Sequence, residues 1–509
     1  MKDFANDALI IGIIDAGIMR RGIAQIAAAA GLKVVLNDVN ETATHDAESF
    51  VHKMLDMAAE KGRMTTEEAA AGKSNLSIST KLSELAEADM VIEAIIEKLK
   101  IKQPLFKELE GIVSEECIIA TNTSSLSVTA VATACETQCR IAGCHFFNPV
   151  PLMKLIEVIG GIKTEGKIIE QITALIKRLG HTPVNVNDSS GFLVNHMGRD
   201  LSTESLQILF EKITEPYIVD TVIRDCVGLR MGAFELMDLT ALDVTCPVSE
   251  QIYEQYYHDP RLRPTPALKQ RYVAGILGKK VGTGYYLYED GNKINPVDPE
   301  PPQLVSTKSF WVSSAILEYA DKVLALLKTA GVEIDEGERP ERDRINIITP
   351  LGLDATTAAI DEALDPERVV AVDALFSNEK RICLMTNPTT LDEVINDTWA
   401  AFAKTGSAVS VIKDSAGFIA QRIVANIINT ASDIAQQGIA RPEDIDTGAR
   451  FGLGYPKGPL ALGDELGVGT ILEILENLQV VYGDPRYRPS PWLRRRVMLS
   501  LSLLHTDNS

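Results

Sequence analysis

The sequence predicts an α/β fold in which a sheet domain followed by an all-helical domain occurs twice along one chain. Three observations support this prediction. Apolar runs of strand length alternate with helical patterns from residue 8 to residue 157, as in a doubly wound parallel sheet. Helical periodicity then continues to about residue 278. Segments of this helical region recur near the C-terminus, which indicates an internal duplication.

The duplication is visible in two pairs of segments. VSVIKDSAGFIAQRI (409–423) echoes VNVNDSSGFLVNHM (184–197), and VYGDPRYRPSPWL (481–493) echoes YYHDPRLRPTPAL (256–268). The expected segments are an N-terminal sheet domain (1–184), a first helical copy (185–290), a polar, Pro-rich linker (291–305), a degenerate second sheet domain (306–410) and a second helical copy (411–509). We expect the two helical copies to pack on each other with approximate two-fold symmetry.

Composition narrows the class of partner. The chain has 509 residues, 45% of them hydrophobic and 24% charged, which is typical of a globular protein with a sizeable core. A formal net charge of -20 argues against nucleic acid and against an anionic membrane surface. The seven cysteines are irregularly spaced, so we expect reduced thiols and no metal site. No apolar run is long enough to span a membrane and no cleavage signal is present, which favours a cytoplasmic protein.

The N-terminal unit predicts dinucleotide binding. Ala8–Ile14 is expected to form a buried strand, Gly22–Ala30 a helix and Lys33–Asn37 a second strand. Asp38 follows that strand, about 20 residues beyond a glycine turn, where an acid binds the adenosine ribose hydroxyls. The acid favours NAD over NADP, because it would repel a 2′-phosphate.

The turn between the first strand and helix departs from the phosphate-binding fingerprint. Residues 15–20 read DAGIMR, and only Gly17 of the glycines in G-x-G-x-x-G is present. Asp15 adds a carboxylate, and Arg20 a long side chain, at a helix N-terminus that should receive pyrophosphate. We expect both to weaken NAD binding. The alternative is that Asp15 pairs with Arg20 or Arg21 and leaves a reshaped but usable turn.

Two further predicted strands end in polar residues. Met90–Ile96 ends at Glu97, and Cys117–Thr121 leads into a Ser/Thr/Asn cluster that contains Ser124. Such a cluster is first of all a helix N-cap. It can also line a ligand crevice, because open α/β sheets bind ligands at the carboxyl ends of their strands. Both interpretations of Ser124 stay open at this point.

The strongest candidate for chemistry is RIAGCHFFNPVPLMKLIEV, residues 140–158. His145 ends one apolar run, Asn148 and Pro149 predict a turn, and a second apolar run carries Glu157. A strand-turn-strand path can bring Glu157 beside His145, so that one imidazole nitrogen is held and the other is free to act as a base. The alternative is a buried histidine with an unrelated carboxylate, since such pairs are common.

The second half of the chain is expected to be structural. A second α/β stretch begins near Leu304, but it has no glycine-rich phosphate turn and no counterpart of His145. Its strand candidates are INIIT, VVAVD and ICLMT. In the repeated helical segment, Gln421 stands where the first copy has Asn195.

Taken together, these motifs resemble the 3-hydroxyacyl-CoA dehydrogenase family. The resembling segments are, in chain order, VIEAIIEKLKIK, TNTSSLS, HFFNPVPLMKLIEV, DSSGFLVN and GKKVGTGYY. The chain has a long form of the family pattern, with a second sheet and the terminal segment NLQVVYGDPRYRPSPWLRRR. In this it is similar to the bacterial family members that act in phenylacetate degradation. The resemblance implies a Rossmann-type N-terminal domain, acyl-CoA metabolism of the β-oxidation kind and NAD as cofactor. The implied reaction is oxidation of a 3-hydroxyacyl-CoA, 3-hydroxyadipyl-CoA or 3-hydroxybutyryl-CoA, to the 3-ketoacyl-CoA.

The resemblance also implies roles for individual residues. His145 matches the family's catalytic base and Glu157 its orienting carboxylate. Ser124 and Asn195 match residues that hydrogen-bond the substrate near the reacting carbon, and Asn148 matches a supporting polar residue of the substrate site. The residues implied on the cofactor side are Gly17, Ile18, Met19, Asp38, Glu97, Lys102 and Asn122. Lys53, Lys61 and Arg63 are candidates for the CoA phosphates, or simply a solvated helix face.

The chain departs from the family pattern at several positions. Asp15 and Arg20 replace glycines, and Ser190 replaces the proline of D-x-P-G-F. Arg230 and Ala233 stand where the family usually has a Tyr or Phe next to Pro-Met-Gly, and a proline before the phenylalanine. Two functions therefore remain: an active NAD-dependent dehydrogenase, or a non-catalytic acyl-CoA-binding homologue with impaired NAD binding. Beside the intramolecular pseudo-dimer of the helical copies, dimerisation of the whole chain also stays open.

Overall fold

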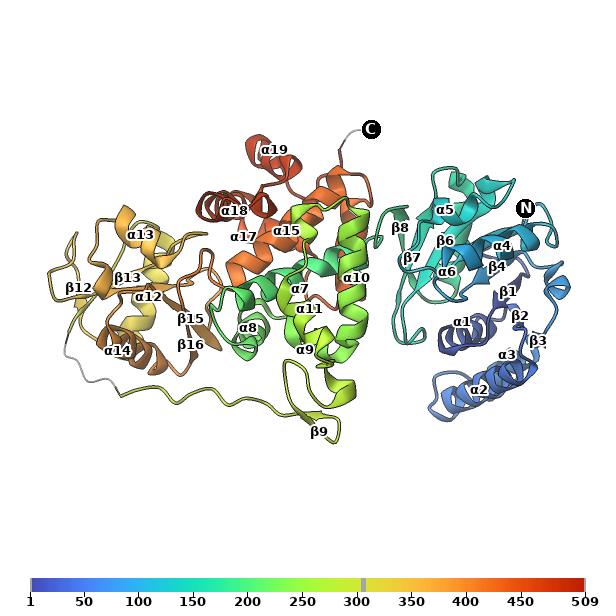
Figure 1. Ribbon diagram of the computed structural model, residues 1–509, viewed down its shortest axis with the longest axis horizontal. Coiled ribbons are helices and arrows are strands. Elements are labelled where there is room, and N and C mark those ends of the chain that lie inside the picture. Colours follow the sequence, from blue (N-terminus) through green and yellow to red (C-terminus); the bar gives the residue numbers. More distant parts are fainter. Residues whose placement is uncertain (1, 304–307, 508–509) are drawn as a thin grey trace. The chain divides into compact units, whose positions relative to one another are not determined.

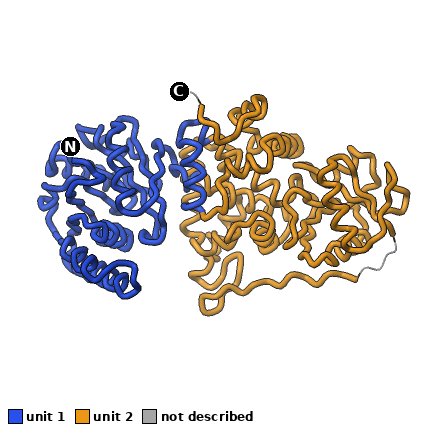
Figure 2. Tube along the Cα trace, turned by 180° about the vertical axis from the view of Figure 1, so that it is seen from behind, with its two compact units in different colours: residues 1–196, 434–453 blue, residues 197–433, 454–509 orange. Residues whose placement is uncertain are grey.

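The computed structural model describes residues 2–303 and 308–507. The chain forms two compact units (Figure 2). Unit 1 comprises Met1–His196 and Ile434–Leu453, and unit 2 comprises Met197–Asp433 and Gly454–Ser509. The predicted boundary near Leu304, with the adjoining ends of the linker and of the second sheet domain, lies outside the described residues.

Unit 1 is built on an eight-stranded sheet of order β3-β2-β1-β4-β5-β6-β7-β8 (Figure 1). The strands are β1 (Ile10–Ile14), β2 (Lys33–Asn37), β3 (Leu76–Ser79), β4 (Met90–Glu93), β5 (Ile118–Thr121), β6 (Ile141–Phe146), β7 (Leu155–Gly160) and β8 (Thr182–Asn187). Neighbouring strands are parallel except for the antiparallel pair β6 and β7. The predicted doubly wound sheet is confirmed, and its order reverses between β1 and β4, the switch point at which such sheets bind ligands.

Helices cover both faces of this sheet. They are α1 (Ile18–Ala29), α2 (Glu41–Glu60), α3 (Thr66–Ser74), α4 (Leu99–Glu110), α5 (Val128–Ala132) and α6 (Gly166–Arg178). Successive residues of a strand point to opposite faces, and β4 shows the consequence. Met90 and Ile92 join the core under α1 and α6, whereas Val91 joins the core under α4.

A helix from the second helical copy belongs to unit 1. This helix, α16 (Pro442–Gly452), packs against β7 and β8. The Asn187 N–H donates to the Ile439 carbonyl over 2.8 Å. A Cβ atom on Gly448 would lie 2.7 Å from a Leu193 methyl, so only glycine permits this close approach.

Unit 2 contains most of both helical copies. The first copy supplies α7 (Val194–Phe210), which begins in unit 1, and α8 (Pro216–Val222), α9 (Ala233–Thr240), α10 (Leu242–Gln255) and α11 (Pro266–Val273). The second copy supplies α15 (Ala420–Gln436), α17 (Pro459–Leu466), α18 (Val468–Tyr482) and α19 (Pro491–Leu499). No helix within the described ranges has both the length and the apolarity needed to cross a membrane.

Unit 2 also contains a six-stranded sheet of order β12-β11-β13-β14-β15-β16. Its strands are β11 (Phe310–Val312), β12 (Ile334–Asp335), β13 (Ile345–Ile348), β14 (Val369–Val372), β15 (Arg381–Thr386) and β16 (Ala408–Ile412). Its helices are α12 (Leu317–Ala330), α13 (Ala355–Asp361) and α14 (Asp392–Ala403). Only β14 and β15 pair antiparallel. The predicted strands INIIT, VVAVD and ICLMT coincide with β13, β14 and β15.

Inside unit 2 the two helical copies meet through reciprocal hydrogen bonds. Arg261 Nη2 donates to the Arg488 carbonyl over 2.8 Å, and Arg486 Nη2 donates to the Arg263 carbonyl over 3.1 Å. Arg261 and Arg486 occupy the same position of the repeated D-P-R-x-R-P motif, as do Arg263 and Arg488. A contact from i to j that is matched by one from j to i is the pattern of a two-fold interface.

Candidate active site

The antiparallel pair β6 and β7 places His145 directly opposite Glu157. His145 Nδ1 lies 2.6 Å from Glu157 Oε2, and both side chains are buried. The other carboxylate oxygen, Oε1, accepts the N–H groups of Leu193 (3.0 Å) and Val194 (2.8 Å) at the start of α7. A buried carboxylate needs such partners, and these three donors hold Glu157 in one position.

This geometry leaves the far side of the imidazole for chemistry. With its proton on Nδ1 directed at Glu157, the ring presents the lone pair of Nε2. Among the described residues, Glu157 is the hydrogen-bond partner of the imidazole, through Nδ1, and none is recorded for Nε2. The rings of Phe147 and Phe192 lie 4.5 and 5.9 Å from the imidazole, centroid to centroid, and give it an apolar surrounding. Nε2 can therefore accept a proton.

The loop after β5 brings the predicted polar residues to the same end of the sheet. Asn122 Oδ1 accepts the N–H of Phe146, next to His145, over 2.8 Å. Asn195 Nδ2 donates to the Ser124 carbonyl over 3.4 Å, which ties the start of α7 to this loop. Ser124 is exposed, and the N-cap of α5 is Ser127. The alternative interpretation of Ser124 as a helix cap is therefore wrong.

Glu97 and Lys102, two residues predicted to lie on the cofactor side, stabilise this loop through hydrogen bonds and charge. Glu97 Oε1 accepts the Thr123 hydroxyl (2.6 Å) and the Ser124 N–H (2.8 Å). Burial would raise the pKa of Glu97, but the Thr123 hydrogen bond and the Lys102 charge outweigh it, so this carboxyl has a pKa below its usual range. Lys102 is fully buried between Glu97 Oε2 (3.4 Å) and Glu93 Oε1 (2.7 Å).

The sequence analysis missed two carboxylates that shape the site. Glu93 is fully buried and also accepts the Thr121 hydroxyl over 2.9 Å. A lone acid inside the apolar run MVIEAII was the available signal, because a buried charge requires a partner. Asp188 accepts the N–H of Thr129 and the hydroxyl of Ser127, both over 2.7 Å, and so anchors the first turn of α5.

The residues predicted to bind the cofactor at its adenosine and pyrophosphate end lie at the carboxyl ends of β1 and β2. Asp38 Oδ2 accepts the Ala16 N–H over 2.8 Å, Gly17 is the N-cap of α1, and Ile18 and Met19 begin that helix. An acid at the end of β2 beside a helix N-terminus fits the adenosine ribose of a dinucleotide. Between these parts, however, the Gly17 N–H donates to Asp15 Oδ1 over 2.8 Å. The position of Asp38 and the start of α1 therefore fit NAD. The place in the turn where the pyrophosphate would bind is taken by the Asp15 carboxylate.

Of the pairings that the sequence left open for Asp15, the structure shows the one with Arg20. Arg20 Nη2 lies 3.2 Å from Asp15 Oδ2. Arg21 is engaged elsewhere, because its Nε donates to the Ala16 carbonyl over 2.9 Å.

A cleft of about 290 Å³ lies between α1, α2 and the Asn148–Pro149 turn, whose peptide bond is cis. Its lining combines methionines and other apolar side chains with two cations, Lys61 and Arg63. Asn148 lines it as well, whereas Lys53 is exposed on α2 and does not. The cleft is thus an apolar groove that carries positive charge and adjoins the predicted substrate residue Asn148.

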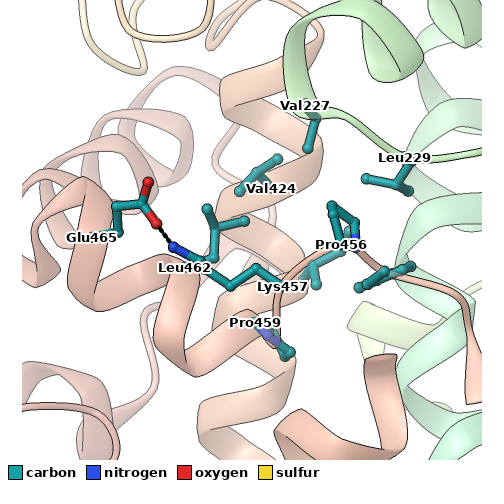
Figure 3. A pocket seen from close by; sticks show the side chains of 10 residues that line it. Val227, Leu229, Val424, Pro456, Lys457, Pro459, Leu462 and Glu465 are labelled. Atoms are coloured by element: carbon teal, nitrogen blue, oxygen red, sulfur yellow. Dashed lines mark ion pairs between the residues drawn. The ribbon is translucent and has the colours of Figure 1, made fainter. Parts of the chain in front are cut away.

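A second cavity, of about 250 Å³, lies within unit 2 (Figure 3). Val227 and Leu229 of the first helical copy and Val424 and Pro456 of the second face it. Lys457 and Glu465 form an ion pair beside it.

The repeat explains why both copies contribute to this cavity. Segment 227–234, VGLRMGAF, is equivalent to segment 453–460, LGYPKGPL, at the same spacing that separates Asn195 from Gln421. Pro456 and Pro459 occupy the positions of Arg230 and Ala233. The prolines that the first copy lacks are therefore present in the second, an equivalence that the sequence analysis missed.

Comparison with known proteins supports the fold and the reaction class. Residues 10–189 match the model of the 3-hydroxyacyl-CoA dehydrogenase NAD binding domain, and residues 191–288 and 417–501 match that of the C-terminal domain of the same enzymes. The second of these matches confirms the predicted repeat.

Similar proteins include both long and short chains. The chain is 34% identical over 494 residues to 3-hydroxyadipyl-CoA dehydrogenase of Escherichia coli (strain K12), covering 96% of this chain and 97% of that one. It is 38% identical over 278 residues to a probable 3-hydroxybutyryl-CoA dehydrogenase of Deinococcus radiodurans, covering 54% of this chain and 99% of that one.

A solved structure extends this similarity to three dimensions. The crystal structure of 3-hydroxybutyryl-CoA dehydrogenase from Escherichia coli K12 superposes with a TM-score of 0.86 at 33% identity, covering 97% of this chain and 99% of that one. Because the similarity runs through both copies of the repeat and nearly the whole length of the chain, the protein belongs to the 3-hydroxyacyl-CoA dehydrogenase family of NAD-binding oxidoreductases.

Proposed function

We propose that the protein oxidises a 3-hydroxyacyl-CoA to the 3-ketoacyl-CoA, with His145 as base and Glu157 as its orienting carboxylate. The observation that carries this proposal is the 2.6 Å contact between His145 Nδ1 and Glu157 Oε2, together with the two N–H groups that fix the carboxylate.

In this mechanism the C3 hydroxyl of the substrate donates its proton to His145 Nε2 while C3 releases a hydride. NAD, when bound, supplies the acceptor of that hydride. Glu157 stabilises the imidazolium that forms and keeps its ring in place, because the negative charge lies against Nδ1–H. Ser124 and Asn195 hydrogen-bond the C3 oxygen as its bond to carbon becomes a carbonyl. Glu97, Lys102 and Asn122 hold the loop that carries Ser124.

The cleft beside Asn148 receives the CoA moiety in this proposal. Lys61 and Arg63 line it and would face the phosphates, while Met54 and Met57 would contact the apolar parts of the ligand. We expect Lys61→Gln and Arg63→Gln each to raise the KM for the acyl-CoA about tenfold, equivalent to ~1.4 kcal/mol. An acyl thioester that lacks the nucleotide should show no such change. Lys53→Gln is the matched control, because Lys53 is exposed on α2 outside the cleft.

For the acyl group we propose 3-hydroxyadipyl-CoA, because the relative matched over 97% of its length carries that substrate in its name. The solved relative is named for 3-hydroxybutyryl-CoA, so the two substrates are the ones to compare. The experiment measures kcat/KM for both by NADH formation. A higher value for 3-hydroxybutyryl-CoA would refute the adipyl assignment, and absence of turnover with both would refute the dehydrogenase activity.

The second candidate function is a non-catalytic acyl-CoA-binding protein. The Asp15 carboxylate on the Gly17 N–H favours it, because this contact opposes cofactor binding. Acyl-CoA binding by calorimetry without measurable NADH binding would identify this function.

We also propose that the contact between the two helical copies replaces a dimer contact within one chain. The reciprocal arginine hydrogen bonds support this proposal. We expect light scattering to give the molar mass of one chain. Shorter relatives measured at the same concentrations provide the comparison.

A further inference from the structure

The turn between β1 and α1 keeps the backbone conformation of a glycine turn without the glycine. Asp15 has φ = 84°, in the left-handed region that glycine adopts freely and other residues rarely do. Aspartate is among the few side chains that tolerate it. The path of the chain at this turn is therefore that of a phosphate-binding turn, and the departure from the fingerprint lies in the side chain.

The Asp15 carboxylate takes up the donor that a phosphate would use. Its Oδ1 accepts the N–H of Gly17, the N-cap of α1, over 2.8 Å. The first N–H groups of a helix have no partner inside the helix, and together with the helix dipole they attract an anion. Here that anion is part of the chain itself.

Arg20 holds the carboxylate there and has hydrogen-bonding capacity to spare. Its Nη2 lies 3.2 Å from Asp15 Oδ2, and its side chain is 19% exposed. Its Nε is buried and has no hydrogen-bond partner among the described residues. A guanidinium presents a planar set of donors that matches a phosphate as well as a carboxylate. Arg20 is therefore equipped to exchange one anion for the other.

We propose that Asp15 is a built-in competitor of the dinucleotide pyrophosphate, and that Arg20 passes from Asp15 to the phosphate when NAD binds. Before binding, Asp15 neutralises Arg20 and satisfies the Gly17 N–H. When NAD binds, the carboxylate must leave that N–H, and the free-energy cost of moving it weakens NAD binding. Asp38 stands beside the same turn and adds a second negative charge through its contact with the Ala16 N–H. This competition takes place in the NAD-binding domain alone and is the same whichever acyl-CoA is the substrate.

The test is NADH binding to the full chain, measured by calorimetry without acyl-CoA. Asp15→Asn keeps the size of the side chain and removes its charge, and Asp15→Gly also relieves the backbone. We expect each to tighten NADH binding about tenfold or more, equivalent to ~1.4 kcal/mol or above. Asp46→Asn is the matched control, because Asp46 is exposed on α2. Unchanged or weaker binding by both Asp15 variants, with unaltered thermal unfolding, would overturn the proposal.

Arg20→Gln separates transfer to the phosphate from simple neutralisation of Asp15. If Arg20 contacts the phosphate, this change weakens NADH binding about tenfold in the wild-type and in the Asp15→Asn background alike, ~1.4 kcal/mol in each. If it acts only on Asp15, the effect disappears in the Asp15→Asn background, and the proposed transfer is wrong. Lys53→Gln controls for the loss of one positive charge on unit 1.

Two ligand fragments locate the effect on the phosphates. Adenosine 5′-diphosphoribose contains the pyrophosphate, and adenosine does not. Asp15→Asn should tighten the former as it tightens NADH and leave the latter unchanged. An equal change for adenosine would place the effect outside the pyrophosphate and contradict the proposal.

Discussion

The two sheets of this chain place different side chains at the same topological position. In unit 1, β6 pairs antiparallel with β7, and β7 pairs parallel with β8. In unit 2, β14, β15 and β16 repeat this arrangement. Glu157 faces Val184 of β8, and Cys383 faces Ser410 of β16, the repeat equivalent of Val184 when Asp188 is aligned with Asp414.

This alignment identifies the counterparts of the proposed dyad. The N–H of Asp373 donates to the Cys383 carbonyl over 3.0 Å, so Asp373 stands where His145 stands opposite Glu157. The equivalent of Glu157 is therefore Cys383. The expectation that the second half has no histidine at this position holds, and the residue found there is an aspartate.

We call the place where the antiparallel strand pair meets the following helical copy a junction: His145, Glu157 and Asn195 in the first sheet domain, and Asp373, Cys383 and Gln421 in the second. The side chain of Gln421 fills the second junction. Its Nε2 donates to Asp373 Oδ1 over 2.9 Å, and its Oε1 accepts the Gly352 N–H over 2.9 Å. Gln421, Asp373 and Cys383 are each 1% exposed. In the first copy the shorter Asn195 lies beside the exposed Ser124. One backbone arrangement can therefore support either an accessible site or a closed core, and the side chains at a few positions determine which of the two forms.

Both junctions retain what folding requires. Asp188 accepts the N–H of Thr129 at the start of α5, and Asp414 accepts the N–H of Ala355 at the start of α13, each over 2.7 Å. A carboxylate at a helix N-terminus is stabilising wherever it occurs. This shared contact therefore marks the fold, whereas the differing residues mark the proposed chemistry.

The largest effect in this comparison is expected from His145→Gln. Glutamine cannot act as a base, so kcat should fall by about two to four orders of magnitude, the range for a positioned general base. The matched variant at the other junction, Asp373→Asn, should leave kcat within about twofold. Near-normal turnover of His145→Gln in steady-state assays would remove the distinction between the junctions.

Glu157→Gln should have the next largest effect, on both activity and stability. The amide carries no charge to stabilise the imidazolium, and it cannot direct an oxygen at Nδ1–H and at both N–H groups as well as the carboxylate does. We expect kcat to fall about tenfold to a thousandfold and the melting temperature to drop. Cys383→Ser is the matched change and should leave kcat as it is. Full activity of Glu157→Gln together with a lowered melting temperature would show that the pair is only structural.

Exchanging the amides of the two copies should separate activity from stability. Asn195→Gln lengthens a side chain beside Ser124, and we expect kcat/KM to fall about tenfold, or ~1.4 kcal/mol in the transition state. Gln421→Asn should instead lower the free energy of unfolding by about 1–3 kcal/mol, because Asp373 and the Gly352 N–H lose buried partners. Chemical denaturation and kinetics on both variants decide the matter, and a loss of activity from Gln421→Asn alone would contradict the assignment.

In the second sheet domain, Asp373 should make the stability of the protein depend on pH. Burial raises the pKa of Asp373 to about 6 from an ordinary value of 3.8, although the Gln421 hydrogen bond opposes the shift. Between these values the folded chain keeps a proton that the unfolded chain has lost, so stability falls as pH rises through this window and is level above it.

Asp373→Asn removes this titration and should therefore help most at neutral pH. We expect the variant to gain up to about 3 kcal/mol over the wild type near pH 8 and almost nothing near pH 4, less what the nearby Lys322 loses as a charge partner. Urea midpoints at several pH values measure this. Parallel curves for the two proteins would show that Asp373 does not titrate in this range.

Features that depend on local or repeated patterns could be predicted from the amino-acid sequence. Apolar periodicity predicted the doubly wound sheet, and the echo of residues 184–197 in 409–423 predicted the helical repeat. The contact of His145 with Glu157 was also within reach, because one turn joins two adjacent strands and leaves few ways to pair them. Asp38 could be placed for the same reason, at the end of a strand inside one βαβ unit.

Features that depend on distant residues, or on competition between polar partners, became visible only in the folded chain. Short or half-exposed strands such as β3 and β8 carry a weak pattern and form because neighbours supply their hydrogen bonds. The docking of α16 on β8 joins segments from both halves of the chain, and no local pattern encodes it. Whether Asp15 pairs with Arg20 or Arg21, and which serine caps α5, depends on which groups lie within hydrogen-bonding distance in the folded chain. Asp373 could be recognised as the counterpart of His145 only once the register of β14 against β15 was known, because a shift of one residue would place a different side chain there.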